Sequence, residues 1–356
     1  MVSRGVVAAV CLGGYIVASM VLVRVIPLRG DKKRIKEVLK KRFPYSVTRI
    51  AHRGGSLIGP ENTMYTFQRA VFEYNTDMLE LDVQQSKDGE IVVSHDADLS
   101  RTCVMGHHNT SVDNLMVSGD PNATLPQSRR KIPLHFKSLL RGDHYEATEA
   151  VPVDETTRVC LLSEVFDAFP KIPIHIDIKC EGADFTERVL KLIEQYGRET
   201  KTFVGSSNWR NRSHILRYFQ RGHSAGGEDP QEKRKRFRIF AGPLDYVIVQ
   251  VAYYLGVLPF FPLSFDVFSI PIFTKSKKEE LDSYFTRFLA YFLNSPTLWE
   301  HLQRRGILVV GWVLNDPEEF EEATKWPING IMSDDLGALN AFFDAHDVSA
   351  TMNLLD

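Results

Sequence analysis

The feature that most constrains the fold of this chain is the order of its apolar runs. From residue 47 onward, short apolar runs alternate with longer stretches of helical character. The runs lie at 48–52, 78–83, 90–95, 173–179, 201–206, 237–241, 307–313 and 328–333. Eight such units predict an α/β fold, and we expect a (β/α)₈ TIM barrel with its active site at the carboxyl ends of the strands. A doubly wound open sheet is the alternative that fits the same alternation.

Two stretches exceed a minimal barrel. Residues 101–158 are polar and have no clear period, so we expect an insertion after the third strand. Residues 244–273 are too apolar for a surface connection and follow the basic run 233–238. They fit a second membrane span, an ordinary core helix or a hydrophobic segment that faces a membrane, and their composition favours the last.

Residues 1–26 predict a transmembrane anchor. The segment 5–23 is uncharged and mostly apolar, and a helix of that length rises about 28 Å, close to the thickness of a bilayer core. A cleaved signal peptide, the alternative, has a shorter apolar core and a small-residue cleavage site. We therefore expect a single-pass protein of the endoplasmic reticulum or another intracellular membrane.

The side of the membrane is harder to predict. Nine Lys or Arg residues at 24–42 predict a basic juxtamembrane linker, 27–46, that lies in the cytosol with the enzymatic part at 47–345 and a tail at 346–356. Asn-x-Ser/Thr sequons at Asn109, Asn122 and Asn211 favour the lumen instead. The charges carry more weight in our interpretation, because sequons also arise by chance.

Composition excludes several classes of protein. The 356 residues carry a formal net charge of −2, which gives no case for nucleic-acid binding. The four cysteines form no Cys-x-x-Cys pair, so they predict neither a zinc site nor a thioredoxin-like redox site.

Two runs carry charges at alternate positions. Since side chains at i and i+2 point to one face of a strand, Glu80 and Asp82 share a face, and so do Asp177 and Lys179. Inward charges are costly unless they are paired or bind a metal ion. Three carboxylates without a cysteine ligand favour Mg²⁺ or Ca²⁺. The alternatives are an exposed edge strand and buried salt bridges with Lys179.

Two histidines end predicted strands near these carboxylates. His52 and His95 suit a general acid and a general base. Arg53 and Lys179 suit an anionic substrate, Arg as a bidentate fork and Lys as a point charge. Trp312, on the run at 307–313, is either a core residue or a wall of the substrate pocket.

Seven motifs together resemble those of the glycerophosphodiester phosphodiesterase family. They are HRG at 52–54, PENT at 60–63, ELD at 80–82, SHD at 94–96, IDIK at 176–179, GWVLN at 311–315 and GIMSD at 330–334. The resemblance runs from about residue 48 to 340 and implies a TIM barrel that cleaves phosphodiesters with a divalent metal ion. It implies an acid–base pair of His52 and His95, metal ligands at Glu80, Asp82 and Asp177, phosphate contacts from Arg53 and Lys179, and Glu61 near the metal or His52.

One position departs from the family pattern. Most members have Glu where this chain has Asp177, although the related spider-venom phospholipases D share Asp-x-Lys and a Trp that resembles Trp312. The anchor and the segment 253–263 resemble the membrane-bound lysophospholipase D branch. That branch implies release of choline or an ethanolamine-type headgroup from lysophospholipids, which leaves lysophosphatidic acid. A phosphodiesterase for water-soluble glycerophosphocholine and a non-catalytic, membrane-tethered lipid-binding protein are the alternatives.

Overall fold

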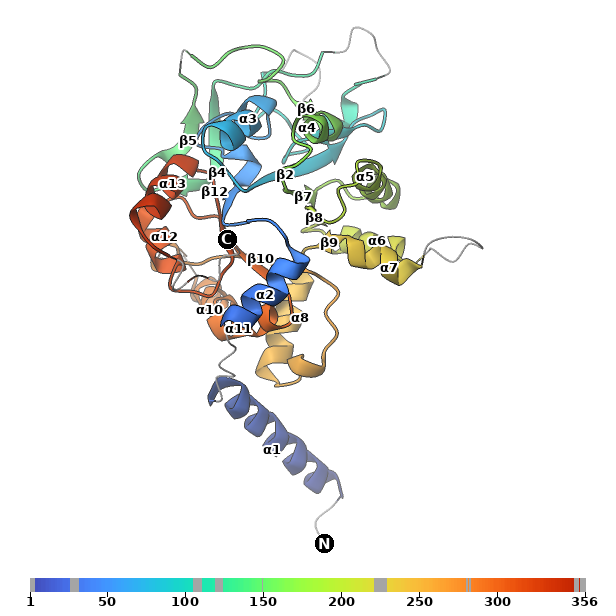
Figure 1. The fold of residues 1–356 in the computed structure, drawn as a ribbon, viewed down its shortest axis with the longest axis vertical. Helices are drawn as coiled ribbons and strands as arrows, with labels where there is room; N and C mark the ends of the chain where they lie inside the picture. The colour runs from blue at the N-terminus through green and yellow to red at the C-terminus, as the bar shows by residue number, and fades with distance from the viewer. Residues whose placement is uncertain are drawn as a thin grey trace.

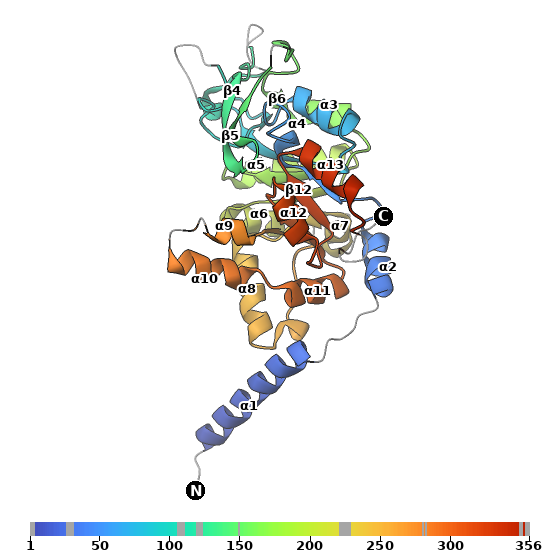
Figure 2. The same cartoon turned by 90° about the vertical axis from the view of Figure 1, so that its left-hand side faces the viewer.

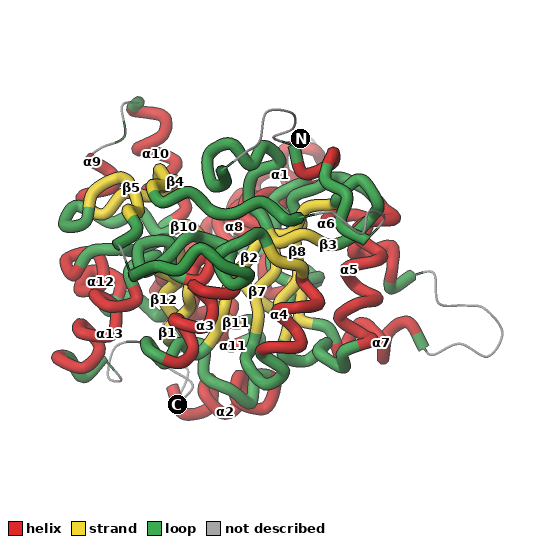
Figure 3. The backbone as a smooth tube through the Cα atoms, turned by 90° about the horizontal axis from the view of Figure 1, so that it is seen from above, coloured by secondary structure: helices red, strands yellow, loops and turns green. Residues whose placement is uncertain are grey.

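Eight parallel strands form the centre of the protein (Figure 3). The computed structural model describes residues 4–25, 32–104, 111–118, 124–148, 150–220, 229–279, 281, 283–348 and 352. The strands follow one another as β10 (Val267–Pro271), β11 (Leu308–Trp312), β12 (Gly330–Ser333), β1 (Arg49–Ala51), β2 (Met78–Gln85), β7 (Ile174–Ile178), β8 (Thr202–Gly205) and β9 (Arg238–Ile239). The parallel pair Phe240–Val267 links the two ends of this sheet and nearly closes the barrel. The predicted (β/α)₈ barrel is therefore confirmed.

Helices surround the strands (Figures 1 and 3). Most of them bury one apolar stripe, as in α5 (Ala183–Gln195), where Phe185, Val189 and Ile193 are fully or almost fully buried. The other outer helices are α3 (Met64–Phe72), α4 (Leu162–Ala168), α6 (Trp209–Tyr218), α7 (Pro230–Arg236), α8 (Pro243–Tyr254), α9 (Lys275–Glu279), α10 (Tyr284–Leu293), α11 (Pro296–Arg304), α12 (Pro317–Ala323) and α13 (Leu336–Ala345).

One predicted barrel strand is wrong. The run at 90–95 forms β3 (Ile91–Val93), which pairs antiparallel with the end of β2 and with β6 (Cys160–Leu161) outside the barrel. The missing barrel strand is β10, which lies within the apolar stretch 244–273. Because the barrel order passes from β2 to β7, the insertion follows the second barrel strand and not the third.

The stretch 244–273 is divided among several elements. It contains most of α8, the 3₁₀ turn η3 (Leu258–Phe260) and β10. Val267, Phe268 and Ile270 of β10 are fully buried, so a membrane-facing role for this part of the stretch is wrong. The inner side of α8 is also core, since Val249, Ala252 and Tyr253 are buried.

The described part of the insertion carries a two-stranded hairpin. The hairpin consists of β4 (Lys131–Ser138) and β5 (Gly142–Glu146), and a short 3₁₀ turn, η2 (Val112–Asn114), precedes it. The hairpin end is held to the barrel by Asp316, which accepts hydrogen bonds from the Ser138 hydroxyl at 2.7 Å and the Leu139 amide at 2.8 Å. These contacts place β4 over the carboxyl ends of the barrel strands.

Two helices precede the barrel. The predicted anchor forms α1 (Arg4–Val25), and α2 (Lys32–Arg42) follows it. Across the stretches that the structure describes, we find no helix with both the length and the hydropathy needed to cross a membrane. Ile35 and Leu39 of α2 are buried, together with Phe43, against barrel residues such as Leu308. This helix therefore closes the amino-terminal end of the barrel.

The sequons give little support for a lumenal enzyme. Asn211 is fully buried, and its amide donates to the carbonyl groups of Ile178 and Cys180. A glycan cannot be attached to this side chain in the folded protein. Asn109 and Asn122 lie outside the described residues.

Candidate active site

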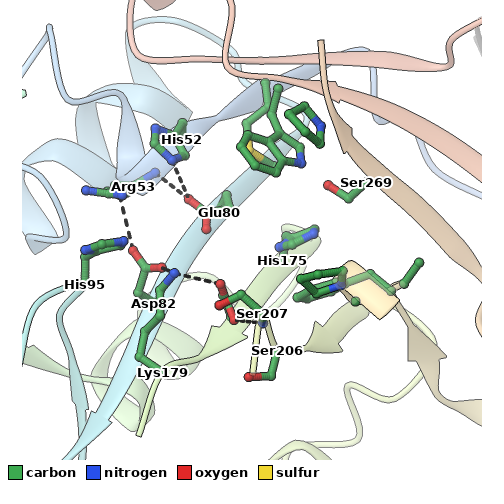
Figure 4. A pocket seen from close by; sticks show the side chains of 18 of the residues that line it. His52, Arg53, Glu80, Asp82, His95, His175, Lys179, Ser206, Ser207 and Ser269 are labelled. Carbon is green, nitrogen blue, oxygen red and sulfur yellow. Dashed lines mark hydrogen bonds and ion pairs between the residues drawn. The ribbon is translucent and has the colours of Figure 1, made fainter. Parts of the chain in front are cut away.

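A cavity of about 460 Å³ opens at the carboxyl ends of the strands (Figure 4). Eight of the nine predicted site residues line it: His52, Arg53, Glu80, Asp82, His95, Asp177, Lys179 and Trp312. Glu61, the ninth, is buried behind Arg53 and contacts it. The structure therefore brings residues that are up to 260 positions apart in the sequence into one site.

The carboxylates come from two neighbouring strands. Glu80 and Asp82 point from β2 into the cavity, while Leu79, Leu81 and Val83 on the opposite face are fully buried in the core. In the β2–β7 register Asp82 lies beside Asp177. The ammonium group of Lys179 bridges these two carboxylates, with 3.1 Å from Nζ to Asp82 Oδ1 and 2.7 Å to Asp177 Oδ2.

The two buried carboxylates of β2 have opposite pKa shifts. Burial by itself would raise the pKa of Asp82, but the charges of Lys179 and Arg53 hold it well below its usual value. Burial, and then the charge of Asp82, raise the pKa of Glu80 well above its usual value. The site thus has more buried negative charge than its own cations neutralise. A hard divalent ion with oxygen ligands fits such a donor set.

His52 is oriented by a carboxylate that sequence reasoning missed. Its Nδ1 lies 2.6 Å from Asp334 Oδ1, and its Nε2 lies 4.0 Å from Glu80 Oε2. Burial would raise the pKa of Asp334, but His52 and Arg53 keep it below its usual value, so Asp334 is ionised and can only accept. The proton of neutral His52 must then sit on Nδ1, which leaves a lone pair on Nε2.

His95 has a similar partner. Its Nδ1 lies 2.6 Å from Asp96 Oδ1, and Arg101 Nε donates to the other oxygen of Asp96 at 2.5 Å. The pKa of Asp96 would rise through burial but is lowered by the hydrogen bonds from His95 and Arg101. The Asp in the SHD motif was visible in the sequence, yet its contact with His95 was not predicted.

A third histidine enters the site from the insertion. His135 on β4 accepts a hydrogen bond from Arg53 Nη1 at its Nδ1, 2.6 Å away, and its ring centre lies 4.6 Å from that of His95. Burial and the charges of Arg53 and Arg101 lower the pKa of His135 to about 4, so it is neutral at pH 7. Nothing in the aperiodic sequence of the insertion distinguishes this histidine.

His95, Asp96 and His135 also resemble a metal-binding group. Among the described residues, only their ligand atoms form a set of three within 4.8 Å of one another. However, Arg101 already neutralises Asp96, and Arg53 contacts His135. The two guanidinium groups oppose a further cation at this group. Cations also lie against the predicted ligands, since Arg53 and Lys179 both contact Asp82.

Arg53 is held rigidly at the head of the site. Its Nη1 donates to Glu61 Oε1 at 3.0 Å, and its Nε lies 3.4 Å from Asp82 Oδ2. Burial would lower the pKa of Arg53, but Glu61 and Asp82 raise it. Its backbone adopts a φ of 52°, and the backbone amide donates to Glu80 at 2.8 Å. The resemblance placed Glu61 near the metal or His52, and its observed contacts are with arginines.

Aromatic side chains form the remaining wall. Phe136 of β4 packs edge-on against Trp312, with ring centres 6.2 Å apart, and also touches His52. Phe240 and Tyr246 line the other side of the cavity. Trp312 is thus a pocket residue as well as the end of β11. Phe136, like His135, belongs to the insertion and was not predicted.

The floor contains a buried imidazole. His175 lies stacked on Phe240, with ring centres 4.3 Å apart, and neither ring nitrogen has a hydrogen-bond partner among the described residues. Burial, the largest effect, lowers the pKa of His175 to about 3. Its alternation with Asp177 was visible in the sequence, but no role was assigned to it.

The family relationship follows from these residues and from comparison with known proteins. The model of the glycerophosphoryl diester phosphodiesterase family matches residues 52–251, which contain both histidines and all three candidate ligands. The chain belongs to this family. It is therefore an enzyme, a phosphodiesterase that acts on substrates of the glycerophosphodiester type.

The similarity to named relatives extends over most of this chain and most of theirs. "Lysophospholipase D GDPD1" of Rattus norvegicus is 34% identical over 92% of this chain and 94% of its own. "Lysophospholipase D GDPD3" of Homo sapiens is 28% identical, with 84% and 86% covered. A putative glycerophosphoryl diester phosphodiesterase from Silicibacter pomeroyi has a TM-score of 0.56 over 86% of this chain and 97% of that chain. At 16% identity it shows the fold alone.

Proposed function

We propose that this enzyme is a metal-dependent lysophospholipase D. It would cleave lysophospholipids between the phosphate and the headgroup alcohol and release choline or an ethanolamine-type headgroup with lysophosphatidic acid. The relatives named lysophospholipase D support this substrate class. The observation that carries the proposal is one cavity in which the histidine–carboxylate site meets an aromatic wall of Phe136, Phe240, Tyr246 and Trp312. A lysolipid fits both parts of the cavity, because its phosphodiester matches the polar site and its acyl chain matches the aromatic wall.

The two histidines would each transfer one proton during the reaction. His52 takes the proton of the nucleophile at Nε2, because Asp334 holds its other proton at Nδ1. A new P–O bond forms while the P–O bond to the headgroup alcohol breaks. Protonated His95, supported by Asp96, gives its proton to the leaving oxygen. The total number of protons is conserved, since His52 gains one and His95 loses one.

Arg53 and Lys179 would bind the phosphoryl oxygens. Both contact Asp82, so both cations lie at the point where the two strands present their carboxylates. Negative charge grows on the phosphoryl oxygens during the reaction, and fixed cations in a buried site stabilise it strongly. His135 keeps Arg53 in place through the hydrogen bond from Nη1.

Glu80, Asp82 and Asp177 would hold the metal ion, Mg²⁺ or Ca²⁺. Their oxygen donors and their unbalanced negative charge suit a hard cation. When bound, the ion supplies Lewis-acid stabilisation to the phosphate. The side chain of Asp177 is shorter than the Glu that the family resemblance implies at this position, so the choice between the two ions is part of the test below.

Glycerophosphocholine is the second candidate substrate. Family membership and the polar half of the cavity suit a soluble glycerophosphodiester equally well. Its choline group can contact the aromatic wall through cation–π interactions, so the wall favours the lysolipid only through the acyl chain that glycerophosphocholine lacks. The nucleophile, in either case, is water or a free glycerol hydroxyl of the substrate, whose attack would first give a cyclic phosphate.

One assay tests these points together. The full-length protein in phosphatidylcholine nanodiscs is given lysophosphatidylcholine or glycerophosphocholine, with Mg²⁺, Ca²⁺ or a chelator. We expect choline release that needs a metal ion and a higher kcat/KM for the lysolipid. Equal or greater kcat/KM for glycerophosphocholine would contradict the lipid substrate. The first phosphate product identifies the nucleophile, because only attack by a substrate hydroxyl gives a cyclic phosphate.

We propose that α1 attaches the enzyme to an intracellular membrane, with the barrel on the cytosolic side. The apolar segment 5–23 supports this, as do exposed side chains of α1 such as Val10, Leu12 and Val17. The basic residues at 24–42 support the cytosolic side. Endoglycosidase treatment of the cellular protein should leave its mass unchanged, and a glycan on Asn109 or Asn122 would place the barrel in the lumen.

A further inference from the structure

Helix α10 exposes an unusual set of aromatic side chains. Tyr284 is 90% exposed, Phe285 70%, Phe288 64% and Tyr291 66%. Residues 284, 288 and 291 follow one another at i, i+4 and i+7, so they lie on one side of the helix. The Ser283 hydroxyl caps the helix by accepting from the Phe285 amide at 3.1 Å. A folded surface rarely exposes so many aromatic rings together unless another apolar phase covers them.

Helix α8 adds a second exposed stripe next to the first. The rings of Tyr254 and Phe292 stack with their centres 5.2 Å apart, and Gln250 donates to the carbonyl of Phe292, so α8 and α10 touch. We call the two stripes the α8–α10 face. Its exposed residues are Leu244, Val247, Ile248, Val251, Leu255, Tyr284, Phe285, Phe288 and Tyr291.

The α8–α10 face adjoins the catalytic cavity. Pro243 and Tyr246, in the first turns of α8, line the cavity, whereas Leu244 and Val247 between and after them are exposed. Helix α10 follows β10, whose last residue, Pro271, also lines the cavity. Helix α8 thus has one side in the active site and the other in the exposed apolar surface.

The position of α1 indicates what covers this face. In both side views α1 extends from the end of the molecule where α8 lies (Figures 1 and 2). The described side chains of α1 are exposed, so α1 itself does not cover α8 or α10. A lipid bilayer would cover α1 and the α8–α10 face together, because both lie at this end of the molecule.

We infer that the α8–α10 face docks on the lipid bilayer and turns the mouth of the cavity toward the lipid headgroups. This inference rests on the proposed lysolipid substrate, which would then pass from the bilayer to the cavity along α8. Tyrosine and phenylalanine suit the interface between headgroups and acyl chains. The segment 275–282 contains three Lys and three acidic residues, so its charges cancel and the face itself docks through apolar contact.

The structural test uses an added tryptophan. Full-length Phe288→Trp is placed in nanodiscs of phosphatidylcholine that carry bromine on the acyl chains, which quench nearby indole fluorescence. The control is Phe72→Trp on α3, because Phe72 is slightly more exposed, at 71%, and lies outside the α8–α10 face. We expect at least twofold stronger quenching of the added fluorescence at 288 than at 72. Equal quenching at both positions would overturn the inference.

The kinetic test uses polar substitutions. Phe285→Ser with Phe288→Ser should raise the apparent KM for lysophosphatidylcholine in nanodiscs by about tenfold or more, because each buried phenylalanine contributes to membrane contact. Turnover of soluble glycerophosphodiesters should stay within about twofold of wild type, as should both activities of Phe72→Ser. Equal losses on lipid and soluble substrates would also overturn the inference.

The two tests separate docking from substrate choice. If the wild-type enzyme does not hydrolyse lysophosphatidylcholine, the proposed function fails, while strong quenching at position 288 still supports docking. If lysolipid is hydrolysed but position 288 is not quenched, docking fails and the function stands. Shielding of the face that appears without lipid and grows with protein concentration would identify a second copy of the chain as the occupant and refute the bilayer.

Discussion

Asp334→Asn is the sharpest test of the acid–base assignment. The substitution keeps the size of the side chain and removes its charge, which faces His52 Nδ1 at 2.6 Å. The second oxygen of Asp334 accepts from Asn315 Nδ2 at 3.1 Å. The new asparagine side chain at position 334 can accept the hydrogen bond from Asn315 only through its amide oxygen, so its NH₂ group must face His52. His52 must then accept at Nδ1 and carry its proton on Nε2, where it cannot act as a base.

The expected loss can be estimated from electrostatics. Charge centres about 4 Å apart attract by about 4 kcal/mol at an effective dielectric constant of about 20. Loss of this stabilisation for the imidazolium that forms in the transition state corresponds to about 10³-fold in kcat. We therefore expect kcat to fall by about 10³ in the asparagine variant, with KM almost unchanged.

The assay is choline release from the preferred substrate at saturating metal. The matched control is Asp344→Asn on α13, because the Asp344 side chain is 79% exposed and its contact with Arg49 is 3.9 Å long. Thermal unfolding should show that both variants are folded. A kcat within about fivefold of wild type for Asp334→Asn would refute the assignment of His52 as a base oriented by Asp334.

Three other predictions follow from the site. Asp82→Asn should abolish activity and weaken binding of Mg²⁺ or Ca²⁺ in calorimetry; normal turnover would disprove the ligand assignment. His52→Ala and His95→Ala should each lower kcat by about 10²–10⁴-fold, and a substrate with a good leaving group should rescue only the His95 variant. The folded pKa of His175, about 3, lies below its unfolded value of about 6.5, so the unfolded chain binds a proton first and stability falls as pH falls below about 6.5. Urea unfolding at pH 7 and pH 5 should show that the free energy of unfolding of His175→Asn falls on acidification by about 2 kcal/mol less than that of wild type. Equal falls in the two proteins would contradict this.

The sequence carried most of the local information about the site. Alternation within each strand put Glu80 on one face with Asp82, and Asp177 on one face with Lys179. The presence of such charges on two separate strands favoured an interior site over an exposed edge strand. The positions of His52 and His95 at strand ends also followed from local pattern. The inward direction of these side chains, and hence the cavity, could be predicted without knowledge of distant contacts.

The errors arose where local pattern does not determine pairing. An apolar run such as Ile91–Val93 looks the same whether it pairs parallel in the barrel or antiparallel at its edge. The strand Val267–Pro271 was hidden because the residues before it are as apolar as the strand itself. Asp334 meets His52 from 282 residues away, and His135 comes from an insertion without any period, so neither contact had a local signal.

Helix α2 determines where a soluble form of this enzyme can begin. A chain cut at the predicted boundary before residue 47 would lose Ile35, Leu39 and Phe43, whose burial is worth about 5–8 kcal/mol in total, as much as the net stability of many domains. It would also leave the fully buried Asp266 without Arg42, one of its two arginine partners. A truncation for crystallisation should therefore start at Lys32, since the basic segment 32–42 closes the amino-terminal end of the barrel.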